Sequence, residues 1–161
     1  MGARSTTLRR LGAACKRGFA VAWALPLTAC ALPLLPLLLW RGRIRWRDAA
    51  LECYGPGCAW FLRGPWFRLL SGGVGYAAAS IGQLIIGCDA QSLDRCHEHE
   101  RAHVRQAERW GLFFPIAYIV AGVGAIRRAG SLSAFYWDNP FEIEARQAET
   151  KRQADVMRHN Q

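Results

Sequence analysis

The longest uninterrupted apolar run of the chain lies close to its start. Residues 19–40 contain no charged side chain, and a helix needs roughly 20 residues to cross the hydrocarbon core of a bilayer. Prolines at 26, 33 and 36 are expected to kink this helix, which membrane helices tolerate. The pattern therefore predicts a transmembrane anchor over 19–40, preceded by a basic segment over 1–18.

Export signals overlap this run and leave three other interpretations open. Arg9-Arg10 is a weak twin-arginine signal, and the sequence ending at Cys30 resembles a lipobox that would place a lipid on that cysteine. The third alternative is that the run belongs to a conventional signal peptide and is cleaved off. The run continues through Trp40, whereas a mature chain would turn polar, so an uncleaved anchor is favoured. Both flanks are basic, so the orientation of the anchor is not predicted.

The middle of the chain has a weaker pattern. Residues 41–70 mix arginine, tryptophan, glycine and proline, and they are interpreted as an interfacial or irregular lead-in. Residues 71–88 are apolar but broken by glycines, which argue against a helix. Two short strands meeting near 80–82, the second containing 84–86, are preferred to a second membrane span.

The clearest helix follows at residues 90–110, which contain neither glycine nor proline. Asp89 or Ser92 is placed to cap its start, and Gly111 is placed to end it. The apolar stretch 112–126 is short for a membrane span and predicts a buried or membrane-grazing helix that begins near Pro115.

A last helix is expected to begin at Asn139-Pro140, an N-cap residue followed by a good first helical residue. It is expected to lead into a polar tail over 151–161. Residues 71–150 then form one α+β domain, mostly helical, with a short β-hairpin.

One face of the helix over 90–110 is expected to point inward. Its residues recur at spacings of three and four, and they are Leu93, Cys96, Glu100, His103, Ala107 and Trp110. Burying Glu100 and His103 without partners would be costly, so they need partners. His99 lies beside this stripe, four residues before His103, so both imidazoles project toward the same point. The spacing predicts a shared metal ion.

The arrangement H-E-x-x-H adds a chemical role. In this motif the two histidines hold zinc, and the intervening glutamate, here Glu100, acts as the general base toward a water molecule. The simpler interpretation is a charged surface helix whose histidines have other partners. His97 points away from the pair and is expected on the surface.

A catalytic zinc takes three protein ligands and keeps one position open. The third histidine of the longer motif is absent, because position 109 is arginine, and His159 lies in the polar tail. Glu142 and Glu144 both qualify by type. Glu142 also stands three residues after Asn139, where it would complete a capping box.

Charge and cysteine content refine these expectations. The formal net charge is +9, and the arginines that flank the apolar run favour a membrane surface over nucleic acid. The six cysteines form no paired C-x-x-C motifs, which disfavours a four-cysteine zinc site. Cys53 and Cys58 flank a Gly-Pro-Gly turn and either form a disulfide or remain reduced.

The segments HERAH (99–103) and NPFEIEA (139–145) together resemble a small gluzincin. In membrane-bound gluzincins, such as the CAAX prenyl protease and heat-shock protease families, the third ligand begins an E-x-x-A-D motif. The resemblance implies Glu142 as that ligand, while Arg146 stands where those families have aspartate. Residues 80–150 also resemble a group of short bacterial proteins of uncharacterised function that have this core.

Two functions follow as expectations. The first is a membrane-associated zinc metallopeptidase acting on a peptide or protein substrate, with His99, His103 and Glu142 as ligands and Glu100 as base. The second is a non-catalytic zinc-binding module in which the metal joins two helices. The short chain leaves little room for a substrate-binding edge strand or a specificity pocket, which counts against catalysis.

Overall fold

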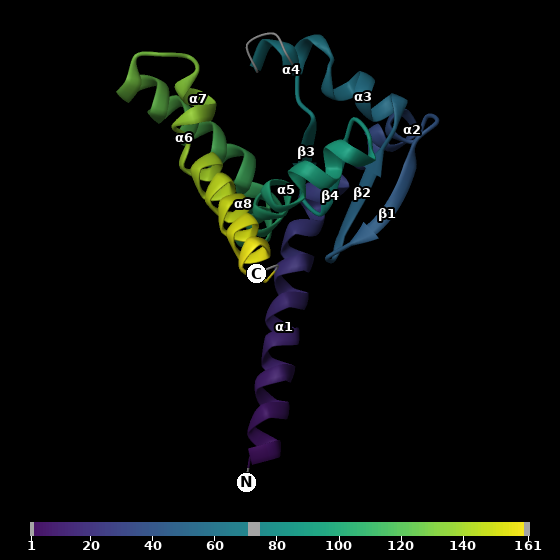
Figure 1. Ribbon diagram of the computed structural model, residues 1–161, viewed down its shortest axis with the longest axis vertical. Coiled ribbons are helices and arrows are strands. Elements are labelled where there is room, and N and C mark those ends of the chain that lie inside the picture. The colour runs from purple at the N-terminus through teal and green to yellow at the C-terminus, as the bar shows by residue number, and fades with distance from the viewer. Residues whose placement is uncertain (1, 71–74, 160–161) are drawn as a thin grey trace.

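The structure is a computed structural model, and it describes residues 2–70 and 75–159 (Figure 1). The fold is α+β, mostly helical, with one small sheet, as expected from the sequence. The helical elements are α1 (Gly2–Ala29), η1 (Leu32–Leu34), α2 (Leu35–Leu38), α3 (Pro56–Leu62), α4 (Pro65–Leu70), α5 (Ala90–Trp110), η2 (Gly111–Phe113), α6 (Phe114–Ala129), α7 (Ala134–Trp137) and α8 (Pro140–His159). The strands are β1 (Arg43–Arg47), β2 (Ala50–Tyr54), β3 (Ala78–Ile81) and β4 (Leu84–Gly87).

The sheet has four strands in the order β1-β2-β4-β3. The predicted hairpin is confirmed as the antiparallel pair β3 and β4, which turns at Gly82, where φ is 60°. Glycine adopts such a positive φ at little cost. β1 and β2 form a second antiparallel hairpin, and β2 pairs with β4 in parallel.

The expectation of an irregular lead-in over 41–70 is wrong, because this range supplies half of the sheet. β1 alternates arginine with apolar residues and is mostly exposed, as is typical of a charged edge strand. β2 is mostly buried although it contains Glu52, whose side chain is fully buried. One partner of that carboxylate, His97, lies 45 residues away in the sequence, so the local pattern does not identify β2 as a strand.

The sheet is covered on both faces. On one face, Ile85 of β4 packs with Leu93 and Val104 of α5. On the other face, Ile86 packs in a cluster with Leu62 of α3 and residues of η1 and α2. β4 is therefore buried along its whole length, which accounts for its continuous apolar sequence.

Local signals place the helix ends where the sequence predicted them. The Asp89 carboxylate caps α5 by accepting a hydrogen bond from the Ser92 amide at 2.7 Å. Gly111 ends α5 with a φ of 57°. Asn139 accepts a hydrogen bond from the Phe141 amide at the start of α8. However, α8 continues through the expected polar tail to His159.

The N-terminal apolar run is broken, as its prolines predicted. The segments Cys15–Ala29 and Leu32–Leu38 are bent by 51°. By length and composition, this bent pair qualifies as one membrane span, and so does the continuous helix Ala90–Ala129. The apolar part of the latter is α6, since α5 is rich in charged residues. The tryptophans expected at a membrane boundary are exposed, which excludes them from the core: Trp40, Trp46, Trp60 and Trp66.

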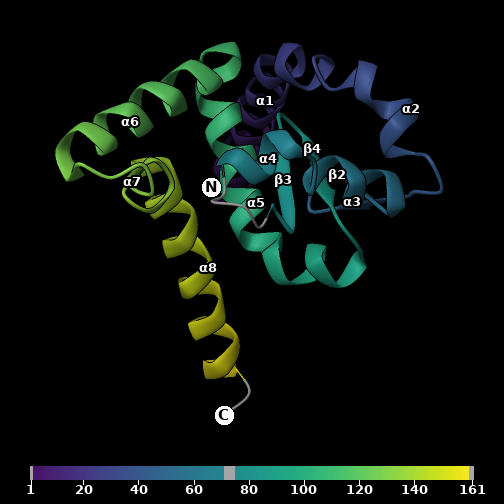
Figure 2. The same cartoon turned by 90° about the horizontal axis from the view of Figure 1, so that it is seen from above.

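The elements separate into two sides around α5. α1 extends well beyond the rest of the molecule at its N-terminal end (Figure 1). Seen from above, α6, α7 and α8 lie on one side of α5, while β2, α2 and α3 lie on the other (Figure 2). α5 therefore meets the sheet on one face and the C-terminal helices on another.

Candidate metal centre

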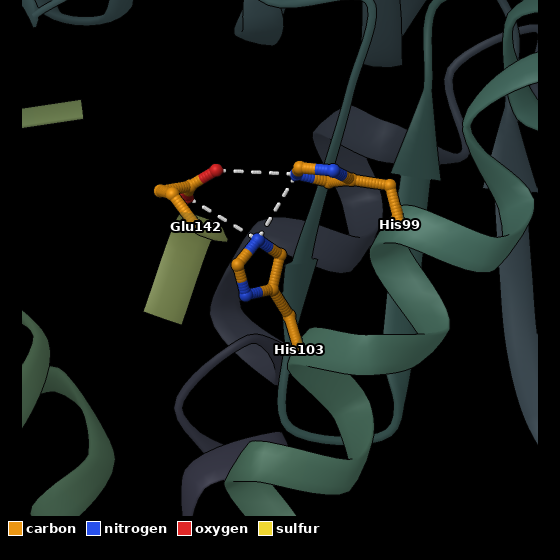
Figure 3. A group of neighbouring side chains, drawn as sticks. All are labelled: His99, His103 and Glu142. Atoms are coloured by element: carbon orange, nitrogen blue, oxygen red, sulfur yellow. Dashed lines mark hydrogen bonds and ion pairs between the residues drawn. The ribbon is translucent and has the colours of Figure 1, made fainter. Parts of the chain in front are cut away.

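Two helices bring three ligand atoms to one point (Figure 3). His99 and His103 lie one turn apart on α5, and Glu142 comes from the first turn of α8. Nε2 of His99 lies 3.2 Å from Oε2 of Glu142, and Nε2 of His103 lies 3.2 Å from Oε1. The two Nε2 atoms are themselves 3.2 Å apart. The three predicted ligands thus lie together, with all three ligand atoms within 4.8 Å of one another.

Gln106 fixes the orientation of His103. Its amide nitrogen donates to the Phe141 carbonyl at 3.0 Å and to the Glu144 carboxylate at 3.2 Å. Its oxygen therefore faces Nδ1 of His103, 2.8 Å away. Because that oxygen only accepts, Nδ1 carries a proton, and in the neutral ring Nε2 keeps its lone pair toward the other two ligands.

Tyr118 of α6 performs a similar role for Glu142. Its hydroxyl donates to Oε1 of Glu142 at 2.7 Å. Burial alone would raise the pKa of Glu142, but hydrogen bonds from His103, His99 and Tyr118 hold it well below its ordinary value. Oε2 of Glu142 is buried and faces Nε2 of His99 at 3.2 Å. An ionised carboxylate between two imidazole nitrogens is suited to a cation.

The pKa of His103 shifts in the opposite direction. Burial alone would lower the pKa of His103, but its hydrogen bond to Glu142 and the charges of Glu100 and Glu142 raise it above its ordinary value. The cluster therefore favours a positive charge at its centre, either a proton or a metal ion.

Glu100 lies beside the cluster without belonging to it. Its side chain is buried, and burial raises its pKa above the ordinary value for glutamate. Ser80 of β3 lies beside it and acts against this rise. Its Oε2 atom has no hydrogen-bond partner among the described residues. One carboxylate oxygen is thus free to accept a proton.

Glu144 and Arg146, which also belong to the first turns of α8, have other roles. Glu144, the alternative ligand, pairs with Gln106 and with Arg109 at 3.2 Å, so it is not part of the cluster. Arg146 bonds the Trp137 carbonyl and lies over the rings of Tyr136 and Trp137. It therefore holds α7 against α8 and does not support a ligand.

The expectation that His97 lies on the surface is wrong. Its Nδ1 lies 2.8 Å from Oε1 of Glu52, and its Nε2 lies 2.9 Å from Oδ2 of Asp48. The helix periodicity assigned only one buried face to α5, but the sheet covers a second face, the one that carries His97. Glu52 also accepts a hydrogen bond from Arg45.

Cys53 and Cys58 are free thiols in the structure, as in the reduced alternative. Their sulfur atoms lie 3.3 Å apart, and Sγ of Cys58 also donates to the Leu38 carbonyl. Contact with Cys53 and burial raise the pKa of the Cys58 thiol. This pair lies on the α3 side of the sheet and contributes no ligand to the cluster.

Two nitrogen donors and one carboxylate can hold a divalent metal ion, and this set is not specific for one metal. Sequence reasoning missed Tyr118, which belongs to no motif. Comparison of the chain with known protein families, with curated proteins and with solved structures found no match in any of the three.

Proposed function

We propose that this chain is a membrane-associated zinc-dependent peptidase of the gluzincin type. The observation that carries the proposal is the convergence of His99, His103 and Glu142 beside the buried carboxylate of Glu100, one oxygen of which has no hydrogen-bond partner among the described residues. Two imidazoles and one carboxylate are a common ligand set for catalytic zinc and leave one coordination position open.

A zinc ion held there would supply Lewis-acid chemistry, polarising a carbonyl and lowering the pKa of a water molecule. The chain's own residues would do the rest. Glu100 accepts the proton of the attacking water and returns it to the leaving amine, a role that its raised pKa favours. Gln106 and Tyr118 keep His103 and Glu142 in position.

The sheet offers a place for an extended peptide. β3 is an edge strand that pairs only with β4 among the described strands, and its Ser80 contacts Glu100. An extended peptide binds such an edge through main-chain hydrogen bonds. This strand supports the peptidase proposal, although the short chain had argued against a substrate-binding edge.

The same proposal places the protein at a membrane. The bent apolar segment Cys15–Leu38 qualifies as a span, and Arg41, Arg43, Arg45 and Arg47 follow it. An apolar segment followed by basic residues is suited to an N-terminal anchor in a bilayer with anionic headgroups.

Substitution of the proposed base tests catalysis. Glu100→Gln is expected to keep one equivalent of zinc, measured by elemental analysis, and to reduce peptide hydrolysis by about 10² to 10⁴-fold. Glu98→Gln is the matched control, because Glu98 lies on the same helix but pairs with Arg152 at 3.7 Å. Equal hydrolysis by the parent and E100Q would contradict the proposal.

A non-catalytic zinc module is the second candidate, and Arg146 favours it. This arginine stands where the gluzincin pattern has aspartate, and it is committed to α7. In such a module the metal would join α5 to α8. Zinc would then bind at one equivalent and raise the melting temperature, while the parent protein would hydrolyse no peptide in any substrate screen.

A further inference from the structure

α6 has two faces with different environments. Its inner face packs against the rest of the molecule, where Gly122 and Ala125 are buried. Tyr118 on this face donates to Glu142, and its carbonyl accepts a hydrogen bond from Asn139 at 3.1 Å. The outer face consists of exposed apolar residues of η2 and α6, namely Leu112, Phe113, Ile116, Ile119, Val120 and Val123.

The outer face is a continuous apolar surface. Its residues follow one another at helical spacing, so they form one stripe along the helix. Ile116 and Val120 are 60% and 66% exposed, and only 17% of the apolar stretch of this helix is buried. Soluble monomers rarely leave a contiguous surface of this kind in water, so it indicates a partner.

The apolar surface continues onto α1. A side chain at Gly111 would collide with the indole ring of Trp23, so η2 and α1 are in direct contact. Phe19, one turn before Trp23, is 72% exposed. η2, which leads directly into α6, therefore contacts the helix that contains the N-terminal apolar segment.

Basic residues stand at both ends of this surface. Arg127 and Arg128 are exposed in the last turn of α6. Lys16 and Arg17 are exposed on α1 just before Phe19. Apolar residues bounded by cations match a bilayer surface, where acyl chains lie below anionic headgroups. A second copy would instead bring an equally basic surface, at a net charge of +9 per chain.

We propose that the outer face of α6 lies in the interface of a lipid bilayer that contains anionic lipids. α6 is then a second membrane contact, independent of the N-terminal segment. It lies along the surface, as an interfacial helix with one apolar and one protein-facing side does. A single helix, with a diameter of about 10 Å, separates the lipid from Glu142.

This position has a consequence for the substrate, which rests on the proposed function. A peptide bond that reaches the cluster lies within about one helix diameter of the membrane surface. The substrates that fit are therefore polypeptide segments next to a membrane.

Photolabelling from lipid tests the contact in the full chain. The protein is reconstituted into vesicles of phosphatidylcholine and phosphatidylglycerol, doped with a phosphatidylcholine that carries a diazirine in its acyl chain. After irradiation, peptide mass spectrometry maps the labelled residues. Label is expected at 112–123 and not at Trp46, which is exposed on β1. Label confined to 15–38 would overturn the proposal.

Paired variants sharpen the result. Ile116→Glu/Val120→Glu should reduce the label at 112–123 by about tenfold or more, because charged side chains partition poorly into lipid. Val156→Glu/Met157→Glu, on exposed apolar positions of α8, should leave it unchanged. If I116E/V120E instead converts a dimer to a monomer without changing the label, the surface is a self-association site and the proposal is wrong.

The test is separable from the peptidase proposal. Labelling requires neither zinc nor hydrolysis and is measured on chelated and on zinc-loaded protein. An inactive protein that is labelled at 112–123 would refute the peptidase alone, and an active protein without that label would refute the membrane contact alone.

Discussion

Two histidine–carboxylate clusters lie on different faces of α5, and they have opposite character. In the metal cluster, three ligand atoms face one another, and both oxygens of Glu142 lie 3.2 Å from imidazole nitrogens. In the His97 cluster, each ring nitrogen faces its own carboxylate, Glu52 on one side and Asp48 on the other. Ligands around an ion converge, whereas the groups of a structural network are satisfied in pairs. Arrangement, more than residue type, distinguishes the two.

The largest expected difference between the clusters is in metal affinity. His103→Ala should weaken zinc binding more than about 100-fold, since even loss of an outer-shell partner commonly costs 10 to 100-fold. His97→Ala should retain the zinc content of the parent protein. Zinc titration with a competing chelator measures both. Equal loss of zinc in the two variants would break the distinction.

For the free energy of unfolding, the His97 cluster is expected to contribute more than the metal cluster. His97→Ala leaves a fully buried oxygen of Glu52 without its donor, and should lower the free energy of unfolding by about 2 kcal/mol. Urea denaturation of the metal-free protein measures this change. His99→Ala, on the partly exposed side of the metal cluster, is the comparison and should cost less. A larger loss for H99A would mean that the metal cluster is the structural one.

A smaller effect is expected from the residue that orients His103. Gln106→Ala removes the acceptor of Nδ1 and should weaken zinc binding by about 10 to 100-fold without abolishing it. Arg105→Ala, at the neighbouring exposed position, is the control and should bind zinc as the parent does. Unchanged affinity in Q106A would show that the amide is only a packing group.

The smallest effect concerns pH. The raised pKa of His103 stabilises the metal-free fold below pH 6.5, the ordinary histidine value, and this contribution is lost as pH rises through the raised value. Zinc requires the deprotonated ring. Glu142, with a lowered pKa, stays ionised throughout. The rise in melting temperature produced by zinc should therefore be smaller at pH 6 than at pH 8, as measured by thermal denaturation with and without chelator. An equal rise at both values would contradict the link to His103.

Local signals explain which parts of the fold were predictable. Asp89, Gly111 and Pro140 mark helix ends through caps that involve neighbouring residues only. β1 and β2 were missed because their charged residues are paired at long range. Arg45, for example, binds Asp94, 49 residues away. A single sequence does not show such pairs, so these strands had the pattern of a polar lead-in.

In the metal cluster, too, local patterns were predictable from the sequence and long-range contacts were not. Two ligands lie on one helix at a spacing of four, and a local pattern is enough to place them together. The third needed a resemblance to choose Glu142 over Glu144. Tyr118 was not predictable, because its role depends on how α6 packs against α8. His97 was misplaced because a helix between a sheet and other helices has more than one buried face.

Gly111 lies at the contact between α1 and the C-terminal end of α5. It ends α5 in a backbone conformation that side chains disfavour, and its missing side chain leaves the space that the Trp23 ring occupies. The N-terminal helix α1 therefore packs against the end of α5, the helix that carries His99 and His103. Any larger residue there would force the Trp23 ring to move, so this glycine allows the proposed anchor to pack against the end of the proposed catalytic helix.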